Sequence, residues 1–315
     1  MNLVILTGGV GGAKLVDGLA AVLTAEELTV VVNTGDDFDH LGLRVCPDLD
    51  TVVYTLAGLV DPETGWGRAD ESWNFLQSLA QLGGPSWFRL GDRDLALHVE
   101  RTRRMDAGEP LSRVTDGLTR ALGVRIKVLP MSDDPTPTVV ITDEGRLPFQ
   151  EYFVARGWQP KVLGFTFDGI EAARPAPGVL EAIQEADAVV IGPSNPWVSV
   201  DPILAVPGIR KALAGKRVLA VSPIVAGLAM KGPAAKMFAE LGIPPSAVAV
   251  AGHYRPVVSE FVLDRSDSEL QGAVEDLAIQ CRLADTVMAT SEDRRRLARQ
   301  VLAFLKEPLG EGRPA

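Results

Sequence analysis

The sequence predicts an α/β fold of the Rossmann-like class: a mostly parallel sheet with helices on both faces and an inserted helical and hairpin region. At the start of the chain, apolar residues 3–6 end in glycines, helix-patterned residues 13–23 follow, and residues 28–32 form a second apolar run. Such a β-loop-α-β unit closes right-handed into a parallel sheet. Strand and helix patterns alternate again from residue 162 onward, which is typical of a parallel sheet covered on both faces.

The region between these two parts has a different character. It holds three tryptophans between residues 66 and 87 and few strand signals. We therefore expect an α/β nucleotide-binding core in residues 1–61 and 159–315, and an inserted helical and β-hairpin region in residues 62–158 that contributes to a binding site.

The remaining elements follow from local patterns and turn residues. The further expected strands are residues 125–129, 138–142, 149–154, 162–167, 188–191, 218–221 and 247–250. The further expected helices are residues 51–59, 92–105, 111–122, 179–186, 209–213, 234–241 and 292–305. Asp50 is well placed to cap the helix at residues 51–59.

The composition favours a protein that acts on small molecules. The 315 residues carry a formal net charge of −10, so we expect no binding to nucleic acid. The two cysteines, Cys46 and Cys281, fit a reducing compartment and argue against a disulfide framework or a cysteine-based zinc site. We expect a cytoplasmic protein, because no apolar run approaches the roughly 20 residues of a membrane span and no signal peptide is recognised.

A glycine-rich segment, Gly8-Gly-Val-Gly-Gly-Ala-Lys14, follows the first strand. It departs from the dinucleotide fingerprint, which would need glycine in place of Lys14, and from the Walker loop, which would need glycine at Ala13. We expect a phosphate site of another type, in which the amides of Gly8, Gly9, Gly11 and Gly12 contact the anion and Lys14 assists. The alternative is a tight strand-to-helix turn that binds nothing.

Two adjacent carboxylates, Asp36 and Asp37, follow the second strand. Ligands of open α/β sheets bind at the carboxyl ends of the strands, and Mg²⁺ is commonly held by one or two carboxylates together with substrate phosphates. We expect Mg²⁺ at this pair, although Gly-Asp-Asp is also a good turn sequence.

Four more residues are candidates on weaker grounds. Asp50 is either a helix cap or a carboxylate that orients or deprotonates a hydroxyl nucleophile. Arg89 either reaches an anionic or aromatic substrate or lies on the surface. Ser194 and Asn195 follow a strand and suit the base or ribose of a nucleotide, although they also suit a proline-rich turn.

Eight segments in one order make the chain resemble the 2-phospho-L-lactate transferase family of coenzyme F-420 biosynthesis. Each segment alone is weak, whereas the set spans roughly residues 1–260 and is specific. The segments are Gly8-Gly-Val-Gly-Gly-Ala-Lys14, Asn33-Thr-Gly-Asp-Asp37, Cys46-Pro-Asp-Leu-Asp-Thr51, Arg89-Leu-Gly-Asp-Arg-Asp94, Leu129-Pro-Met-Ser-Asp-Asp134, Phe149-Gln-Glu151, Gly192-Pro-Ser-Asn-Pro196 and Lys231-Gly-Pro233.

The resemblance implies a reaction between two small molecules. The ribityl hydroxyl of the deazaflavin Fo (7,8-didemethyl-8-hydroxy-5-deazariboflavin) attacks the β-phosphate of a guanosine diphosphate ester that carries lactate or enolpyruvate, and GMP leaves. The resemblance further implies Fo at Asp50 and Arg89, Mg²⁺ near Asp36, and a homodimer. It leaves open which three-carbon acid the donor carries.

A second hypothesis remains, a non-catalytic nucleotide-sugar regulator similar to the gluconeogenesis factor. That related family shares the glycine loop and the α/β core, whereas segments 46–51 and 89–94 are typical of the transferases. A dinucleotide oxidoreductase is less consistent, because the loop breaks its fingerprint at Lys14.

Overall fold

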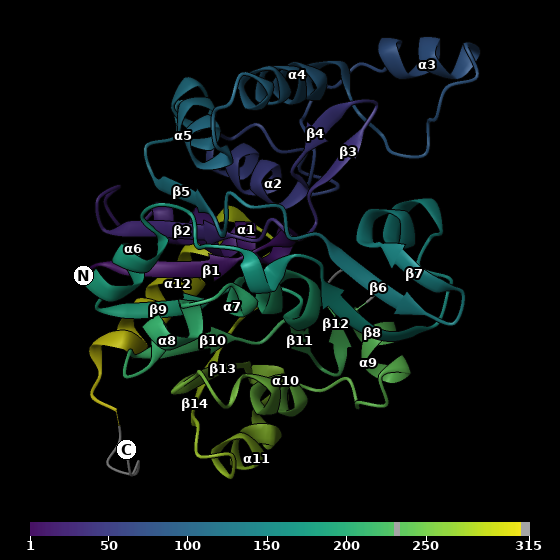
Figure 1. Cartoon of the computed structure of the whole chain (residues 1–315). Helices are drawn as coiled ribbons and strands as arrows, with labels where there is room; N and C mark the ends of the chain where they lie inside the picture. Colours follow the sequence, from purple (N-terminus) through teal and green to yellow (C-terminus); the bar gives the residue numbers. More distant parts are fainter. Residues whose placement is uncertain (230–233, 310–315) are drawn as a thin grey trace.

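One seven-stranded sheet organises the fold, and all neighbouring strands in it are parallel (Figure 1). In the computed structural model, which describes residues 1–229 and 234–309, the strand order is β14-β13-β10-β9-β1-β2-β5. The strands are β1 (Leu3–Thr7), β2 (Leu28–Val32), β5 (Lys127–Pro130), β9 (Ala188–Ile191), β10 (Val218–Val221), β13 (Glu260–Asp264) and β14 (Gln280–Ala284). The predicted Rossmann-like α/β class is confirmed.

Helices cover both faces of this sheet. They are α1 (Gly9–Ala20), α2 (Pro47–Leu56), α6 (Val179–Glu185), α7 (Asp201–Ala205), α8 (Ile209–Leu213), α10 (Ala247–Tyr254), α11 (Gln271–Glu275) and α12 (Ser291–Lys306). Successive side chains of a strand point to opposite faces, so each strand supplies two cores. In β1, Leu3 and Ile5 pack in the core with α1, α2 and α12, whereas Val4 and Leu6 pack in the core with α6, α7, α8 and α10.

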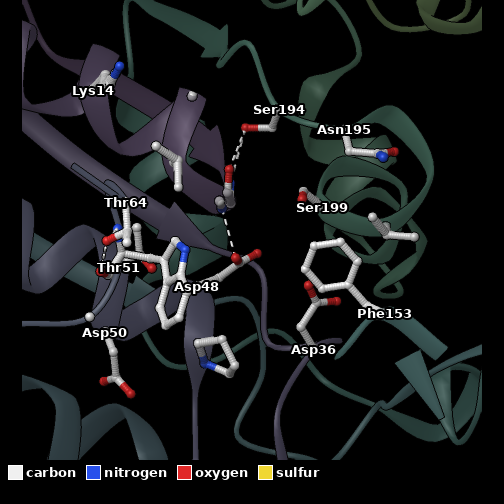
Figure 2. Close-up of a pocket in the computed structure, with 18 of the residues that line it drawn as sticks. Lys14, Asp36, Asp48, Asp50, Thr51, Thr64, Phe153, Ser194, Asn195 and Ser199 are labelled. Carbon is white, nitrogen blue, oxygen red and sulfur yellow. Dashed lines mark hydrogen bonds between the residues drawn. The ribbon is translucent and has the colours of Figure 1, made fainter. Parts of the chain in front are cut away.

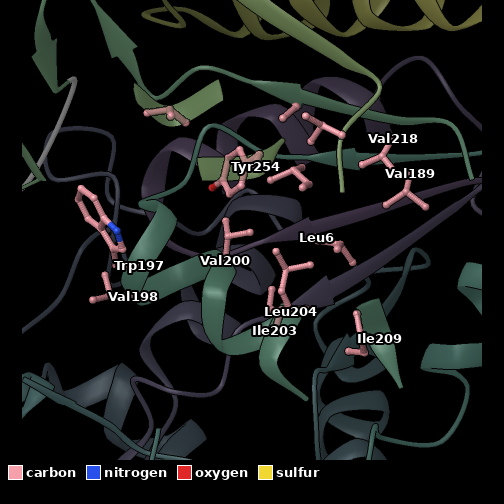
Figure 3. Packing of buried hydrophobic residues seen from close by; sticks show 14 of the residues in the cluster. Leu6, Val189, Trp197, Val198, Val200, Ile203, Leu204, Ile209, Val218 and Tyr254 are labelled. Carbon is pink, nitrogen blue, oxygen red and sulfur yellow. The ribbon is translucent and has the colours of Figure 1, made fainter. Parts of the chain in front are cut away.

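Figure 3 shows the second of these cores. Leu6 and Val189 reach it from neighbouring strands, and Ile203, Leu204 and Ile209 reach it from the short helices packed against this face of the sheet. Burial of this apolar area is what holds the short helices on the sheet, since a five-residue helix is not stable alone.

The order of the strands reverses at β1. From β1 the chain adds β2 and β5 on one side, and it later adds β9, β10, β13 and β14 on the other. Open α/β sheets bind their ligands in the crevice outside the carboxyl ends of the strands at such a reversal. The loops after β1 and β9, which carry the glycine segment and Ser194, meet at this point.

The other elements flank the sheet (Figure 1). A three-stranded antiparallel sheet has the order β7-β6-β8, and β3–β4 and β11–β12 are hairpins. Their bounds are β3 (Phe38–His40), β4 (Leu43–Val45), β6 (Thr138–Thr142), β7 (Gly145–Pro148), β8 (Val162–Phe167), β11 (Ile224–Val225) and β12 (Leu228–Ala229), and the helices are α3 (Asn74–Gln81), α4 (Asp92–Asp106), α5 (Leu111–Ala121) and α9 (Ala234–Glu240). Among the described residues, no helix combines the length and the apolar character that crossing a membrane requires.

Two expectations about the sheets need correction. Strand β5 lies within residues 62–158, the expected insertion, yet it pairs with β2 in the main sheet through contacts such as Val30 with Val128. Residues 162–167 form a strand, but this strand (β8) pairs antiparallel with β6 and not with the parallel sheet. A short apolar run shows that a strand exists, whereas its partner depends on contacts distant in sequence.

Other expectations were wrong about the type of element. Residues 247–250 belong to helix α10, which Ser246 caps by accepting a hydrogen bond from the Ala249 amide at 3.1 Å. A strand was expected at residues 149–154, but β7 ends at Pro148 and a helical turn follows. Strands β13 and β14 were not predicted. β13 begins with Glu260, which is fully buried because Arg217 and Arg282 pair with it.

Candidate active site

A cavity of about 880 Å³ opens at the crevice (Figure 2). Its wall comes from the loops after β1, β2, β9, β10 and β14, and from the segments around α3, α4 and η1 (Glu151–Ala155). Of the predicted site residues, Gly8, Gly9, Gly11, Lys14, Asp36, Asp50, Arg89, Ser194 and Asn195 line this cavity, whereas Gly12 and Asp37 do not. The predicted residues Lys231-Gly-Pro233 lie outside the described part of the chain.

The glycine loop packs closely against its neighbours. Gly9 has φ +65°, a conformation that glycine adopts without strain, and α1 begins there. Its N–H donates to Asp48 Oδ1 at 2.8 Å, and the N–H of Gly8 donates to Ser194 Oγ at 3.3 Å. These two amides therefore already have partners within the protein.

The next glycines are required for close approach between loops. A Cβ at Gly12 would lie 1.7 Å from Thr7 Oγ1, and a Cβ at Gly11 would lie 2.5 Å from the Pro193 carbonyl oxygen. Gly12 thus lies behind the cavity, where it lets α1 approach the end of β1. The sequence analysis expected Gly12 to contact an anion, with a turn that binds nothing as the alternative, and it did not predict this packing function.

Asp36 and Asp48 form a pair of buried carboxylates on the cavity wall (Figure 2). Asp48 accepts hydrogen bonds from the Gly9 amide and from Asn33 Nδ2, whereas Asp36 Oδ1 has no hydrogen-bond partner among the described residues. Burial raises the pKa of Asp48 to about 6. Burial and the nearby charge of Asp48 raise the pKa of Asp36 well above its usual value. Such a pair, with one carboxylate oxygen unsatisfied, has the oxygen ligands that a divalent cation prefers.

Asp37 lies apart from this pair. It lines a separate, smaller cavity beside Ser132 and Thr136, and burial raises its pKa to about 8. The side chains of Asp36 and Asp37 therefore reach different cavities, and Asp48 lines the larger cavity with Asp36. Asp48 was missed because nothing in the sequence distinguishes it from its neighbour Asp50.

Asp50 does not cap a helix. Helix α2 begins at Pro47, and the amide of Asp50 donates to the Cys46 carbonyl oxygen within the helix. The carboxylate lines the cavity and forms a bidentate contact with Arg101: Nη1 donates to Oδ2 at 3.1 Å and Nη2 donates to Oδ1. The capping alternative is therefore wrong.

Arg89 lines the same cavity, together with several aromatic side chains that we call the aromatic rim. Its guanidinium lies 4.3 Å from the centre of the Trp73 ring, a cation–π contact. The aromatic residues that line the cavity are Tyr54, Trp66, Trp87, Phe88, Phe149 and Phe153. The wall therefore has apolar, aromatic parts that suit a planar ring system. The clustered tryptophans were visible in the sequence, but only the structure shows that Trp66 and Trp87 line the cavity and that Trp73 contacts Arg89.

Ser194 and Asn195 line the cavity while also holding the loop after β9. The Ser194 hydroxyl donates to the Gly8 carbonyl oxygen at 2.8 Å, and Asn195 Oδ1 accepts from the Trp197 amide at 3.1 Å. Lys14 Nζ donates to the Met288 carbonyl oxygen at 2.8 Å. Met288 belongs to residues 286–289 after β14, which line the cavity and were not predicted.

Comparison with known proteins decides the family. The family model described as 2-phospho-L-lactate transferase CofD matches residues 3–303. The chain belongs to this family. It is therefore a transferase of coenzyme F-420 biosynthesis, as the eight segments predicted.

Relatives that match along nearly the whole chain are named either phosphoenolpyruvate transferase or 2-phospho-L-lactate transferase. A phosphoenolpyruvate transferase from Kitasatospora aureofaciens is 45% identical over 98% of this chain and 98% of its own length. A 2-phospho-L-lactate transferase from Methanosarcina acetivorans is 40% identical over 96% of this chain and 98% of its own length.

Among solved structures, a UPF0052-family protein from Bacillus halodurans matches with a TM-score of 0.61 at 17% identity, covering 96% of this chain and 98% of that one. This likeness shows the fold alone. Membership of the transferase family favours the enzyme over the non-catalytic regulator.

Proposed function

We propose that this transferase moves a phospholactyl or phosphoenolpyruvyl group from a guanosine diphosphate ester to the ribityl hydroxyl of Fo and releases GMP. One observation carries the proposal: a single cavity joins a buried carboxylate pair beside a helix N-terminus to a polar and aromatic region containing Asp50 and Arg89. The first region suits a diphosphate with a cation, and the second suits a ring system with a hydroxylated chain.

The diphosphate region is the start of α1. Because the Gly8 and Gly9 amides have partners within the protein, the amides of Val10 and Gly11 are the first-turn donors that helix geometry leaves for an anion. Both residues line the cavity. The positive end of the helix dipole would further favour the donor's phosphates.

Asp36 and Asp48 would hold Mg²⁺, since both carboxylates are buried on the cavity wall. Oδ1 of Asp36 has no hydrogen-bond partner in the described part of the chain and would be a ligand. When bound, Mg²⁺ would offset charge on the diphosphate. Phosphoryl transfer relies mainly on positioning and charge neutralisation, so this site needs no covalent nucleophile from the protein.

The acceptor region positions the attacking hydroxyl. Asp50 accepts the hydrogen bond of that hydroxyl, while Arg89 and the aromatic rim hold the deazaflavin ring. The hydroxyl oxygen bonds to the β-phosphorus, the bond from that phosphorus to the bridging oxygen breaks, and GMP leaves with the bridging oxygen. The proton of the hydroxyl passes to the Asp50 carboxylate, which accepts its hydrogen bond, and from there to water.

The test is turnover of defined substrates. Folded protein with Fo, Mg²⁺ and either the lactyl or the enolpyruvyl donor should release GMP in step with the phosphodiester product. A competition between the two donors identifies the three-carbon acid. If a folded sample releases no GMP from either donor, the proposal is wrong.

Asp50→Ala should abolish turnover, although it also leaves Arg101 buried without its partner. Its activity must therefore be expressed per folded molecule. The homodimer and the cytoplasmic location remain predictions, the first of which light scattering would check.

A further inference from the structure

Arg101 is a buried cation beside the acceptor region. It lies on α4 and is only 3% exposed, and its guanidinium reaches Asp50 on α2. A buried charge is costly unless it is paired and hydrogen-bonded, so this residue stays in place only with all of its partners present.

Those partners gather at the two terminal nitrogens of the guanidinium. Both nitrogens take part in the bidentate contact with Asp50. Nη1 also lies 3.2 Å from His98 Nδ1 and 3.3 Å from the Arg44 carbonyl oxygen, so these two acceptors share its second N–H. Arginine can only donate, so Nδ1 of His98 is the acceptor and the ring proton of a neutral imidazole is on Nε2.

The contacts continue behind the imidazole. Nε2 of His98 lies 3.5 Å from Asp94 Oδ1 without forming a hydrogen bond among the described residues, and Asp94 Oδ1 accepts a hydrogen bond from the Tyr54 hydroxyl at 2.5 Å. Tyr54 returns to α2, the helix that carries Asp50. Two connections, Arg101 with Asp50 and Asp94 with Tyr54, therefore join α4 to α2 beside the guanidinium.

We propose that Arg101 is a positioning residue for the transfer reaction: its planar guanidinium fixes the plane of the Asp50 carboxylate and so sets where the acceptor hydroxyl lies. The proposal rests on the proposed function, in which Asp50 binds that hydroxyl. Arg101 itself does not line the cavity, so it acts through a side chain that does, and Asp50 is the one it holds with two hydrogen bonds.

The bidentate geometry is the reason that arginine is needed. A carboxylate turns about its own side-chain torsions, and two parallel N–H···O contacts hold it in one plane. A lysine ammonium at the same place would supply the charge without the fork. Reactive groups misplaced by about 1 Å can cost about 100-fold in rate, so the loss should fall on kcat and not on acceptor binding.

The first experiment separates rate from binding. Arg101→Lys should lower kcat by about 10- to 100-fold. It should leave the Kd for Fo, measured by deazaflavin fluorescence, within about threefold of wild type, because Arg89 and the aromatic rim are intact. Arg103→Lys is the matched control, since Arg103 lies on the same helix, is exposed and pairs with Glu100; its kcat should be unchanged.

A double-mutant cycle then asks whether Arg101 acts through Asp50. Asp50→Asn should lower kcat, and adding Arg101→Met in that background should lower it by less than about twofold more. The double variant removes both buried charges together, so it remains foldable even where Arg101→Met alone does not.

Three results would overturn the proposal. These are a folded Arg101→Lys enzyme with kcat within about threefold of wild type, losses of Asp50→Asn and Arg101→Met that multiply in the double variant, or an Asp50→Asn enzyme as active as wild type. Wild type that fails to convert Fo would instead refute the proposed function, and the positioning role with it.

Discussion

Gly9 donates its backbone N–H to Oδ1 of Asp48 over 2.8 Å, although 39 residues separate them in the chain. Asp48 Oδ2 accepts from Asn33 Nδ2 at 2.9 Å. One carboxylate thus joins the glycine loop after β1 to the acidic segment after β2. The phosphate region and the cation region of the site are therefore parts of one hydrogen-bonded unit, and four predictions follow from its geometry and surroundings.

Asp36→Asn should change the response of the protein to Mg²⁺. Without Mg²⁺ the variant is expected to melt at the wild-type temperature or above, because it removes a buried charge that faces Asp48. Mg²⁺ at about 100 times its Kd should stabilise wild type by about 2.7 kcal/mol and the variant by much less. Thermal melts with and without Mg²⁺ measure this. Asp39→Asn, an exposed neighbour, should respond like wild type, and an equal Mg²⁺ shift in Asp36→Asn would contradict the assignment.

Metal-free protein should lose stability as the pH rises from about 5 to 8. The pKa of Asp48 is about 6 and that of Asp37 about 8, both raised by burial above the ordinary value near 4 of an unfolded chain. The folded state therefore binds more protons than the unfolded state in this window, so the free energy of unfolding falls with pH, by about 1.4 kcal/mol per pH unit for each extra proton. Urea denaturation in EDTA at several pH values checks the sign. Asp37→Asn should flatten the upper part of the curve, and stability that rises over this range would count against both assignments.

Gly12→Ala should destabilise the fold, since the new methyl group would lie 1.7 Å from Thr7 Oγ1. We expect a loss of about 1–3 kcal/mol in the free energy of unfolding, the usual range for overpacking. Gly272→Ala is the matched control: it also lies in a helix, nothing lies within 4 Å of its added Cβ, and alanine favours helices by up to about 1 kcal/mol. Equal stability of the two variants would show that α1 can move away from β1.

Trp73→Ala should weaken the binding of Fo through Arg89. The ring of Trp73 holds the exposed guanidinium at 4.3 Å, and a cation–π contact of this kind contributes about 0.5–1 kcal/mol, or about two- to fivefold in Kd. Fluorescence titration with Fo measures the change. Trp158→Ala removes an exposed tryptophan that neither lines the cavity nor contacts Arg89, so its Kd should match wild type. Unchanged affinity in Trp73→Ala would mean that Arg89 needs no support from the ring.

Part of the fold followed from local patterns because some strands are short apolar runs with clear ends. β1, β2, β9 and β10 are buried over nearly their whole length and stop at glycine, asparagine or serine. β13 escaped prediction because it begins and ends in buried acids. Residues 247–250 resembled a strand because valine alternates with alanine there, whereas Ser246 and burial on several sides favour a helix.

The sequence by itself determined the α/β class, the family and the position of the glycine loop, because these depend on composition, spacing and the order of short segments. Only the tertiary structure decided that Asp48 stands with Asp36, that Asp37 turns away, that Gly12 serves packing, and that Arg101 holds Asp50 from 51 residues along the chain. The physical reason is that the packing of α2 and α4 beside the sheet sets where each side chain points and which partner offsets the cost of its burial. No local pattern in the sequence records that arrangement.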